Sequence, residues 1–204
     1  MCTLYVFTTD NKSAFIRQIT ADAVYNSDGF SVLIAHGTTF SLFRTENLDL
    51  FLDVIVMSDG DRYFAHCRMA TTAYKGVTRC HGLDAGDYTI FHNGVIDYPG
   101  DLDSRGIADL FKNHPLDFAL NALSGFTYAN VIAVDTMTGD YYVNRSEVGS
   151  LHTDGNGSYS TVAIKGTCDT PVPLGYTEYS NASGNTIEND GYDWLDFTDR
   201  RFKV

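Results

Sequence analysis

Cys2, the residue that follows the initiator methionine, carries a side chain that can act as a nucleophile. An initiator Met before a small residue is normally removed, which leaves a thiol and a free α-amine on one residue. Such an amine has a pKa of about 7.7 to 8.0 and can take the proton of a thiol of pKa about 8.5. Cys2 would then carry its own general base. The alternative is a small buried Cys that happens to start a strand.

Asn93 and Gly94 form a second group with chemical potential, in the segment FHNGVI at residues 91–96. At the end of a strand, the Asn93 side-chain amide and the Gly94 backbone N–H can point at one developing oxyanion. Asn-Gly is also a common turn sequence, so the pair alone leaves both interpretations open.

The elements that must position these residues are mostly strands. Apolar alternation with aromatic and β-branched residues predicts them at 2–9, 30–36, 39–45, 62–72, 87–96, 127–136, 140–145 and 159–165. Helices are predicted from Ser13 towards Tyr25, at 103–113 and at 115–125, while 46–57 fits either a helix or a buried strand. This order predicts an α+β layered sandwich of mainly antiparallel sheets and argues against a βαβ nucleotide-binding fold.

The chain of 204 residues is long enough for one domain with a conventional core. From about residue 170 the composition shifts to Pro, Gly, Asn, Ser and acidic residues, and periodicity fades. We therefore predict a domain over 1–168. Residues 169–204 are expected to form an extended acidic, aromatic tail packed on or beside it through Trp194 and Phe197.

Composition argues against several classes of partner. A formal net charge of −12 without a Lys/Arg cluster disfavours nucleic acid. No apolar run approaches the roughly 18 residues needed to cross a bilayer, and no secretory signal is present, so a cytoplasmic location is predicted. Cys67 and the pair Cys80-His81 lack the paired spacings of zinc sites, so no metal is predicted.

Taken in order, an N-terminal Cys2 heading a strand, AHCRMATT at 65–72 and HNGVI at 92–96 resemble the glutaminase landmarks of class II glutamine amidotransferases. DLDSRGIADLF at 101–111 resembles the family segment in which an Asp binds the substrate's α-amino group. LSGFTYANVIAVDTMTGDYYVNRSEVGSLH at 123–152 resembles the stretch after the following helices. The resemblance covers about residues 2–165.

The resemblance implies the four-layer αββα sandwich of N-terminal nucleophile hydrolases, with residues 1–168 as the glutamine amidotransferase domain. It also implies hydrolysis of the glutamine side-chain amide, or of a γ-glutamyl amide, through a thioester and without a cofactor. The roles it assigns are nucleophile and base for Cys2, oxyanion hole for Asn93 and Gly94, α-carboxylate ligand for Arg68, α-amine ligand for Asp103, and further substrate contacts for Thr71 and His92.

The chain also departs from the family pattern. Thr3 and Met69 stand where the family often has Gly and Trp, and only ten positions separate Asn93 from Asp103. Nothing after residue 165 is long enough for an acceptor domain, so transferred ammonia would need a separate acceptor subunit. Stand-alone amidohydrolase, cleavage of a different amide such as a peptide or bile-acid-like conjugate, and an idle fold with a binding or structural role remain alternatives.

Overall fold

The computed structural model describes residues 2–70, 76–96, 104–123, 125, 128–145 and 150–173, together with the backbone of 177–180 and 186–187. The first sheet, sheet A, comprises β1 (Thr3–Thr8), β2 (Phe30–His36), β3 (Thr39–Thr45), β4 (Arg62–Cys67), β9 (His152–Thr153), β10 (Tyr159–Ser160) and β11 (Thr170–Pro171). Its strands lie in the order β11-β9-β10-β1-β4-β2-β3, and each neighbouring pair is antiparallel.

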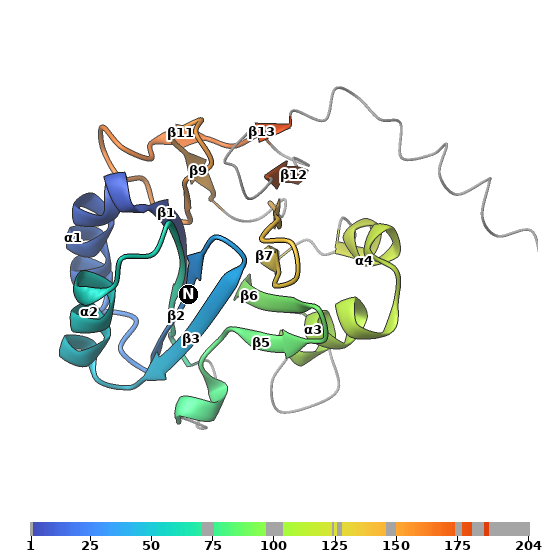
Figure 1. Cartoon of the computed structure of the whole chain (residues 1–204), viewed down its shortest axis with the longest axis horizontal. Helices are drawn as coiled ribbons and strands as arrows, with labels where there is room; N and C mark the ends of the chain where they lie inside the picture. The colour runs from blue at the N-terminus through green and yellow to red at the C-terminus, as the bar shows by residue number, and fades with distance from the viewer. Residues whose placement is uncertain are drawn as a thin grey trace, which may run out of the picture.

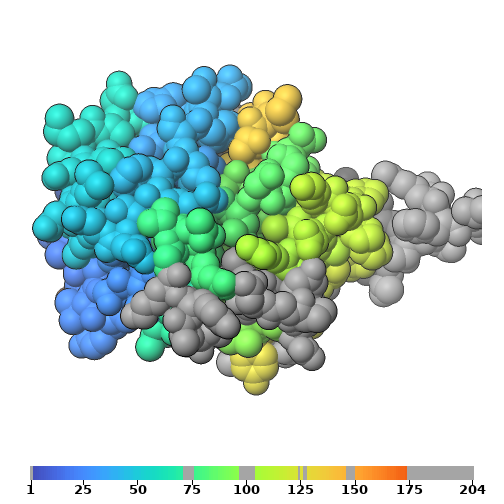
Figure 2. Space-filling view, turned by 90° about the horizontal axis from the view of Figure 1, so that it is seen from below, coloured from blue at the N-terminus to red at the C-terminus, as the bar shows by residue number. Residues whose placement is uncertain are grey.

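The second sheet, sheet B, is also antiparallel, in the order β13-β12-β8-β7-β6-β5. Its strands are β5 (Leu83–Ala85), β6 (Tyr88–Gly94), β7 (Ala129–Asp135), β8 (Tyr141–Asn144), β12 (Thr177–Ser180) and β13 (Thr186–Ile187). Seen from below, the half in blue and cyan that contains β1 to β4 lies beside the half in green and yellow-green that contains β5 to α4 (Figure 2).

Two pairs of helices form the outer layers. Helices α1 (Lys12–Asp22) and α2 (Leu48–Met57) lie on the outside of sheet A, and α3 (Ser104–Asn113) and α4 (Leu116–Leu123) on the outside of sheet B (Figure 1). The order of layers is therefore α, β, β, α, which confirms the predicted fold class. None of the helices in the described ranges is long and apolar enough to cross a membrane.

Three apolar clusters separate the four layers, and strand alternation decides which residues join each one. On β1, Tyr5 and Phe7 face α1 and α2, whereas Leu4 and Val6 face the space between the sheets. Phe91 of β6 enters that same central cluster from the opposite sheet. The third cluster joins sheet B to its helices through residues including Ile90, Ile107, Phe111 and Leu120.

Most predicted elements are confirmed, and the ambiguous segment 46–57 is resolved as a helix. The Asn47 side chain accepts a hydrogen bond from the Leu50 backbone N–H and so caps α2, while Phe51 and Ile55, four residues apart, are buried on one face. The predicted helix from Ser13 to Tyr25 differs at both ends. The structure begins α1 at Lys12, after Asn11, and ends it at Asp22.

Several short strands were not predicted, because two to four residues carry no readable alternation. They include β5, β9, and three strands in the segment expected to be a tail. Of these, β11 pairs with β9 of sheet A and β12 pairs with β8 of sheet B. The sheets therefore extend past residue 168. The predicted docking of Trp194 and Phe197 lies outside the described residues.

Gly94 ends β6 at a place where the chain passes very close to the start of β7. Its φ is 148°, and a Cβ there would lie 1.5 Å from the Tyr128 carbonyl oxygen. The next residue, Val95, donates its backbone N–H to the same carbonyl at 2.9 Å. Only a residue without a side chain fits this crossing.

We expect Gly94→Ala to destabilise the protein more than Gly76→Ala, a matched control. Gly76 has a φ of 126° but nothing within 4 Å of its Cβ position, so that variant costs only backbone strain, about 1–3 kcal/mol. Gly94→Ala adds overpacking of roughly 1–3 kcal/mol because backbone must move. Denaturant unfolding of both variants measures the difference, and equal losses would contradict the close approach.

Candidate active site

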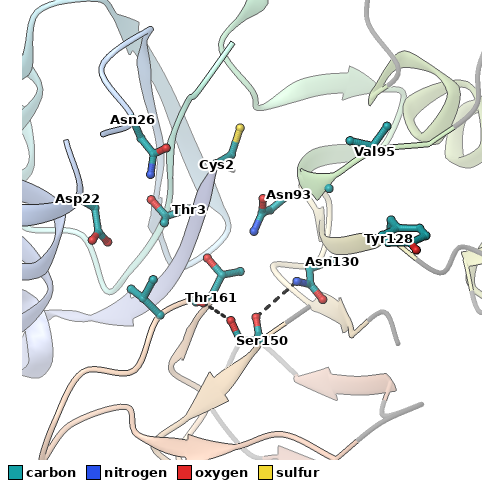
Figure 3. Close-up of a pocket in the computed structure, with 12 residues that line it drawn as sticks. Cys2, Thr3, Asp22, Asn26, Asn93, Val95, Tyr128, Asn130, Ser150 and Thr161 are labelled. Atoms are coloured by element: carbon teal, nitrogen blue, oxygen red, sulfur yellow. Dashed lines mark hydrogen bonds between the residues drawn. The ribbon is translucent and has the colours of Figure 1, made fainter. Parts of the chain in front are cut away.

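Cys2 lines one cavity of about 320 Å³ together with Asn93 and Gly94, from which it lies far apart in the sequence. They meet because β1 and β6 face each other across the two sheets. Cys2 lies two residues before Leu4 and Asn93 two after Phe91, so both side chains extend the faces that form the central core. The cavity thus opens at the ends of these two strands (Figure 3).

The Cys2 thiol contacts the backbone that follows β4. The Met69 N–H donates to the Cys2 Sγ at 3.4 Å, and the Met69 carbonyl oxygen lies 3.6 Å from the same sulphur. This segment is itself anchored, since Arg68 N donates to the Gly29 carbonyl at 2.8 Å and Ala70 N to the Asp28 carboxylate at 2.9 Å. A backbone donor at sulphur stabilises the negative charge of a thiolate.

Asn93 lines the cavity with a buried side-chain amide whose oxygen is unpaired among the described residues. The residue is 7 % exposed. A buried amide without a partner is costly in a folded protein, by about 1–3 kcal/mol. The arrangement provides a polar group for a bound ligand opposite the Cys2 strand.

Arg68 and His92, the other predicted site residues that the structure describes, do not line this cavity. Arg68 is buried, at 5 % exposed, and directly precedes the Met69 contact to Cys2. His92 points to the opposite face of β6 from Asn93, where its Nδ1 lies 2.9 Å from the Ser104 Oγ of α3. Thr71 and Asp103 lie outside the described residues.

Three buried histidines form a stack beside Arg68. The ring centroids of His66 and His81 are 3.9 Å apart with an interplanar angle of 18°, and those of His81 and His92 are 6.0 Å apart at 11°. The His92 backbone N–H donates to His81 Nδ1 at 3.1 Å. The proton of a neutral His81 therefore lies on Nε2, 3.1 Å from the Ser104 Oγ to which it donates.

Burial keeps His66 and His81 uncharged. Burial is the main cause that lowers the pKa of His66 to about 3, and its electrostatic interactions with His92 and Arg68 lower it further. Burial also lowers the pKa of His81, with the neighbouring His66 and His92 adding to the effect. No group of three or more His, Cys, Asp or Glu residues within the described ranges is arranged to hold a metal ion.

Several cavity residues were not found from the sequence, because they come from loops or strand ends without a motif. Thr161 Oγ1 accepts from the Leu4 backbone N–H at 3.0 Å and so holds the start of β1. The Ser150 hydroxyl donates to the Thr161 carbonyl at 2.7 Å, and the Ser150 backbone carbonyl accepts from the Asn130 side-chain amide at 3.4 Å (Figure 3). Asn26, which follows α1, completes this side of the wall.

We expect the buried, neutral His66 to make the free energy of unfolding decrease in acid. Below about pH 6.5 the unfolded chain binds a proton that folded His66 resists until about pH 3, so stability falls across this window as pH falls. His66→Phe keeps a ring on His81 and should reduce the slope by about 1.4 kcal/mol per pH unit. Denaturant unfolding at several pH values measures the slope.

The matched control for this experiment is His114→Gln, which removes an exposed histidine of the segment between α3 and α4. Its unfolding free energy should follow the parent at every pH. A His66→Phe variant that loses stability on acidification as steeply as the parent would contradict a buried, neutral His66.

No protein-family model matches the sequence, and no curated protein is similar to it. Among solved structures, the allosteric regulatory enzyme of purine biosynthesis aligns with a TM-score of 0.68 and 14 % identity, over 90 % of this chain and 48 % of that one. Glutamine phosphoribosylpyrophosphate amidotransferase from B. subtilis aligns with a TM-score of 0.64 and 14 % identity, over 92 % and 49 %. The chain spans about half the length of both. It has the fold of these proteins, which is the fold implied by the sequence resemblance.

Proposed function

We propose that this chain is an amidohydrolase that cleaves the side-chain amide of glutamine, or a γ-glutamyl amide, through a thioester on Cys2. The main support is the meeting of Cys2, Asn93 and Gly94 in the wall of one cavity. In the sequence, neither Cys2 nor the Asn93-Gly94 pair predicted this function when taken alone. A nucleophile and an amide donor on facing strands are the two groups that acyl transfer needs.

In the proposed reaction, removal of Met1 frees the α-amine of Cys2, which takes the proton of the thiol. The sulphur attacks the amide carbonyl carbon, a C–S bond forms, and the carbonyl electron pair moves onto oxygen. The Asn93 amide and the Gly94 N–H donate to that oxyanion. Collapse breaks the C–N bond, and the proton on the α-amine passes to the departing nitrogen to give ammonia. Water then hydrolyses the thioester, which releases glutamate and restores the thiol.

A free amino acid carries one carboxylate and one ammonium, so a specific site needs a fixed cation and a fixed anion. We assign these roles to Arg68 and Asp103, with Thr71 as a further contact. Arg68 lies next to the Met69 segment that contacts Cys2, which puts its backbone at the nucleophile. His92 faces Ser104, so we assign its influence on substrate to packing rather than direct contact.

In this proposal the cavity is the site of amide cleavage, and ammonia is the direct product. The proposal also allows ammonia to pass to a partner enzyme that acts as its acceptor. Free glutamine is a cytoplasmic metabolite, which suits the cytoplasmic location predicted from the sequence. The rival function is an idle copy of the fold with a binding or structural role.

Mass spectrometry of the intact, natively expressed protein tests the nucleophile. We expect loss of Met1 and, after exposure to 6-diazo-5-oxonorleucine, one adduct on Cys2. The control is Cys2→Ala, which should fold normally, take up no adduct and release no ammonia from glutamine. Retained Met1 with an unmodified Cys2 would favour the idle fold. Labelling without glutamine hydrolysis would point to a different amide.

Asn93→Ala tests the oxyanion hole. We expect kcat for ammonia release to fall by about 10²–10³-fold, because one donor to the oxyanion contributes roughly 2.7–4 kcal/mol in the transition state. Asn144→Ala is the matched control, since Asn144 is similarly buried, at 5 % exposed, but does not line the cavity. An Asn93→Ala variant with parental kcat would remove Asn93 from the mechanism.

A further inference from the structure

Asn26 is a buried polar residue at the cavity whose partner is not visible in the structure. It is 4 % exposed, and its Oδ1 has no hydrogen-bond partner among the described residues. The residue is held in place by its backbone N–H, which donates to the Asp22 carbonyl at 3.0 Å. Buried polar atoms without partners are rare, so each calls for a specific explanation.

The side chain of Asn26 is directed toward Cys2 and Thr3 (Figure 3). Both neighbours line the same cavity as Asn26. Cys2 immediately precedes β1. The start of this strand is held by a hydrogen bond from the Leu4 backbone N–H to Thr161 Oγ1. The Cys2 backbone nitrogen therefore lies at the start of an anchored strand, in the residue that shares the cavity wall with Asn26.

Other oxygens in the wall are already in use or lie elsewhere. The Asp22 carboxylate accepts from the Tyr5 hydroxyl and from the Gln18 amide, the latter at 3.0 Å. Thr3 Oγ1 is also buried without a partner among the described residues, but its side chain points to the helix side of β1, near Cys67, as its alternation with Tyr5 requires. Asn93 belongs to the opposite sheet. Asn26 is left as the acceptor on the side of Cys2.

We propose that Asn26 is a positioning residue whose Oδ1 accepts a hydrogen bond from the free α-amine of Cys2 and aims the amine lone pair at Sγ. This inference rests on the proposed function. An amide is suited to the task because it is neutral. A carboxylate in the same place would stabilise the ammonium form, which cannot take a proton from the thiol.

Several charged or titratable groups lie near Cys2. Arg68 precedes the Met69 that contacts its thiol, the Asp28 carboxylate accepts from the Ala70 backbone N–H, and the Cys67 thiol interacts electrostatically with Cys2. The titratable groups in the cavity wall are the Cys2 thiol itself, Asp22 of α1 and Tyr128 ahead of β7, and the remaining wall residues are neutral. Replacing Asn26 by Asp thus adds one new carboxylate close to the amine. Its effect on the amine can be separated from steric effects because Asn and Asp have nearly the same shape.

The test compares Asn26→Ala and Asn26→Asp with the parent in glutamine hydrolysis, after intact mass has established that Met1 is removed from each. Asn26→Ala should lower kcat on the order of ten- to hundred-fold with little change in KM. Asn26→Asp should recover most of kcat at alkaline pH, with the acid limb of its pH profile moved up by about one unit or more.

Tyr159→Phe is the matched control, because Tyr159 also buries a hydroxyl without a partner among the described residues but lies outside the cavity wall. It should keep the parental kcat and pH profile. Parental kinetics in Asn26→Ala, or a change in KM alone, would overturn the inference while leaving the proposed function intact. If Asn26→Ala does not fold, an Asn26→Asp variant whose pH profile keeps the parental acid limb would overturn the inference. A parent that neither hydrolyses glutamine nor labels at Cys2 instead removes the proposed function.

Discussion

The packing of sheet A against sheet B is the constraint on which the rest of the structure depends. Leu4 and Val6 from one sheet and Phe91 from the other are fully or almost fully buried in the same central cluster. A slip of one residue in β1 would send these side chains, and Cys2 with them, to the opposite face. The apolar core therefore determines the direction of the nucleophile. The catalytic geometry we propose is a consequence of the packing.

The same constraint explains why polar groups collect where the two strands end. Inside the core, side chains from both sheets fill the space, but at Cys2 and Asn93 the apolar rows stop and a cavity remains. Hydrogen bonds replace apolar packing there: Thr161 holds the start of β1, and Met69 contacts the thiol. The unpaired amide oxygens of Asn26 and Asn93 are poorly explained by stability alone, since each costs folding free energy unless a ligand satisfies it.

The sequence predicted the long elements and the residues they carry, because alternation over six or seven residues is a strong signal. Strands β2 and β3, and strand β6 that carries Asn93 near its end, were located in this way. It could not locate Asn26 or Ser150 in the cavity, since each comes from a loop whose path depends on tertiary packing. The stack of His66, His81 and His92 was also hidden, because its members belong to separate elements.

A site of this design places few demands on the sequence. The nucleophile and its proposed base belong to one residue, so a single anchored strand end positions both. The Gly94 donor is backbone, and what its position requires is the absence of a side chain. Most of the remaining chain need only preserve apolar alternation and the two helix pairs, which many sequences can do. This accounts for a fold shared with solved structures at 14 % identity.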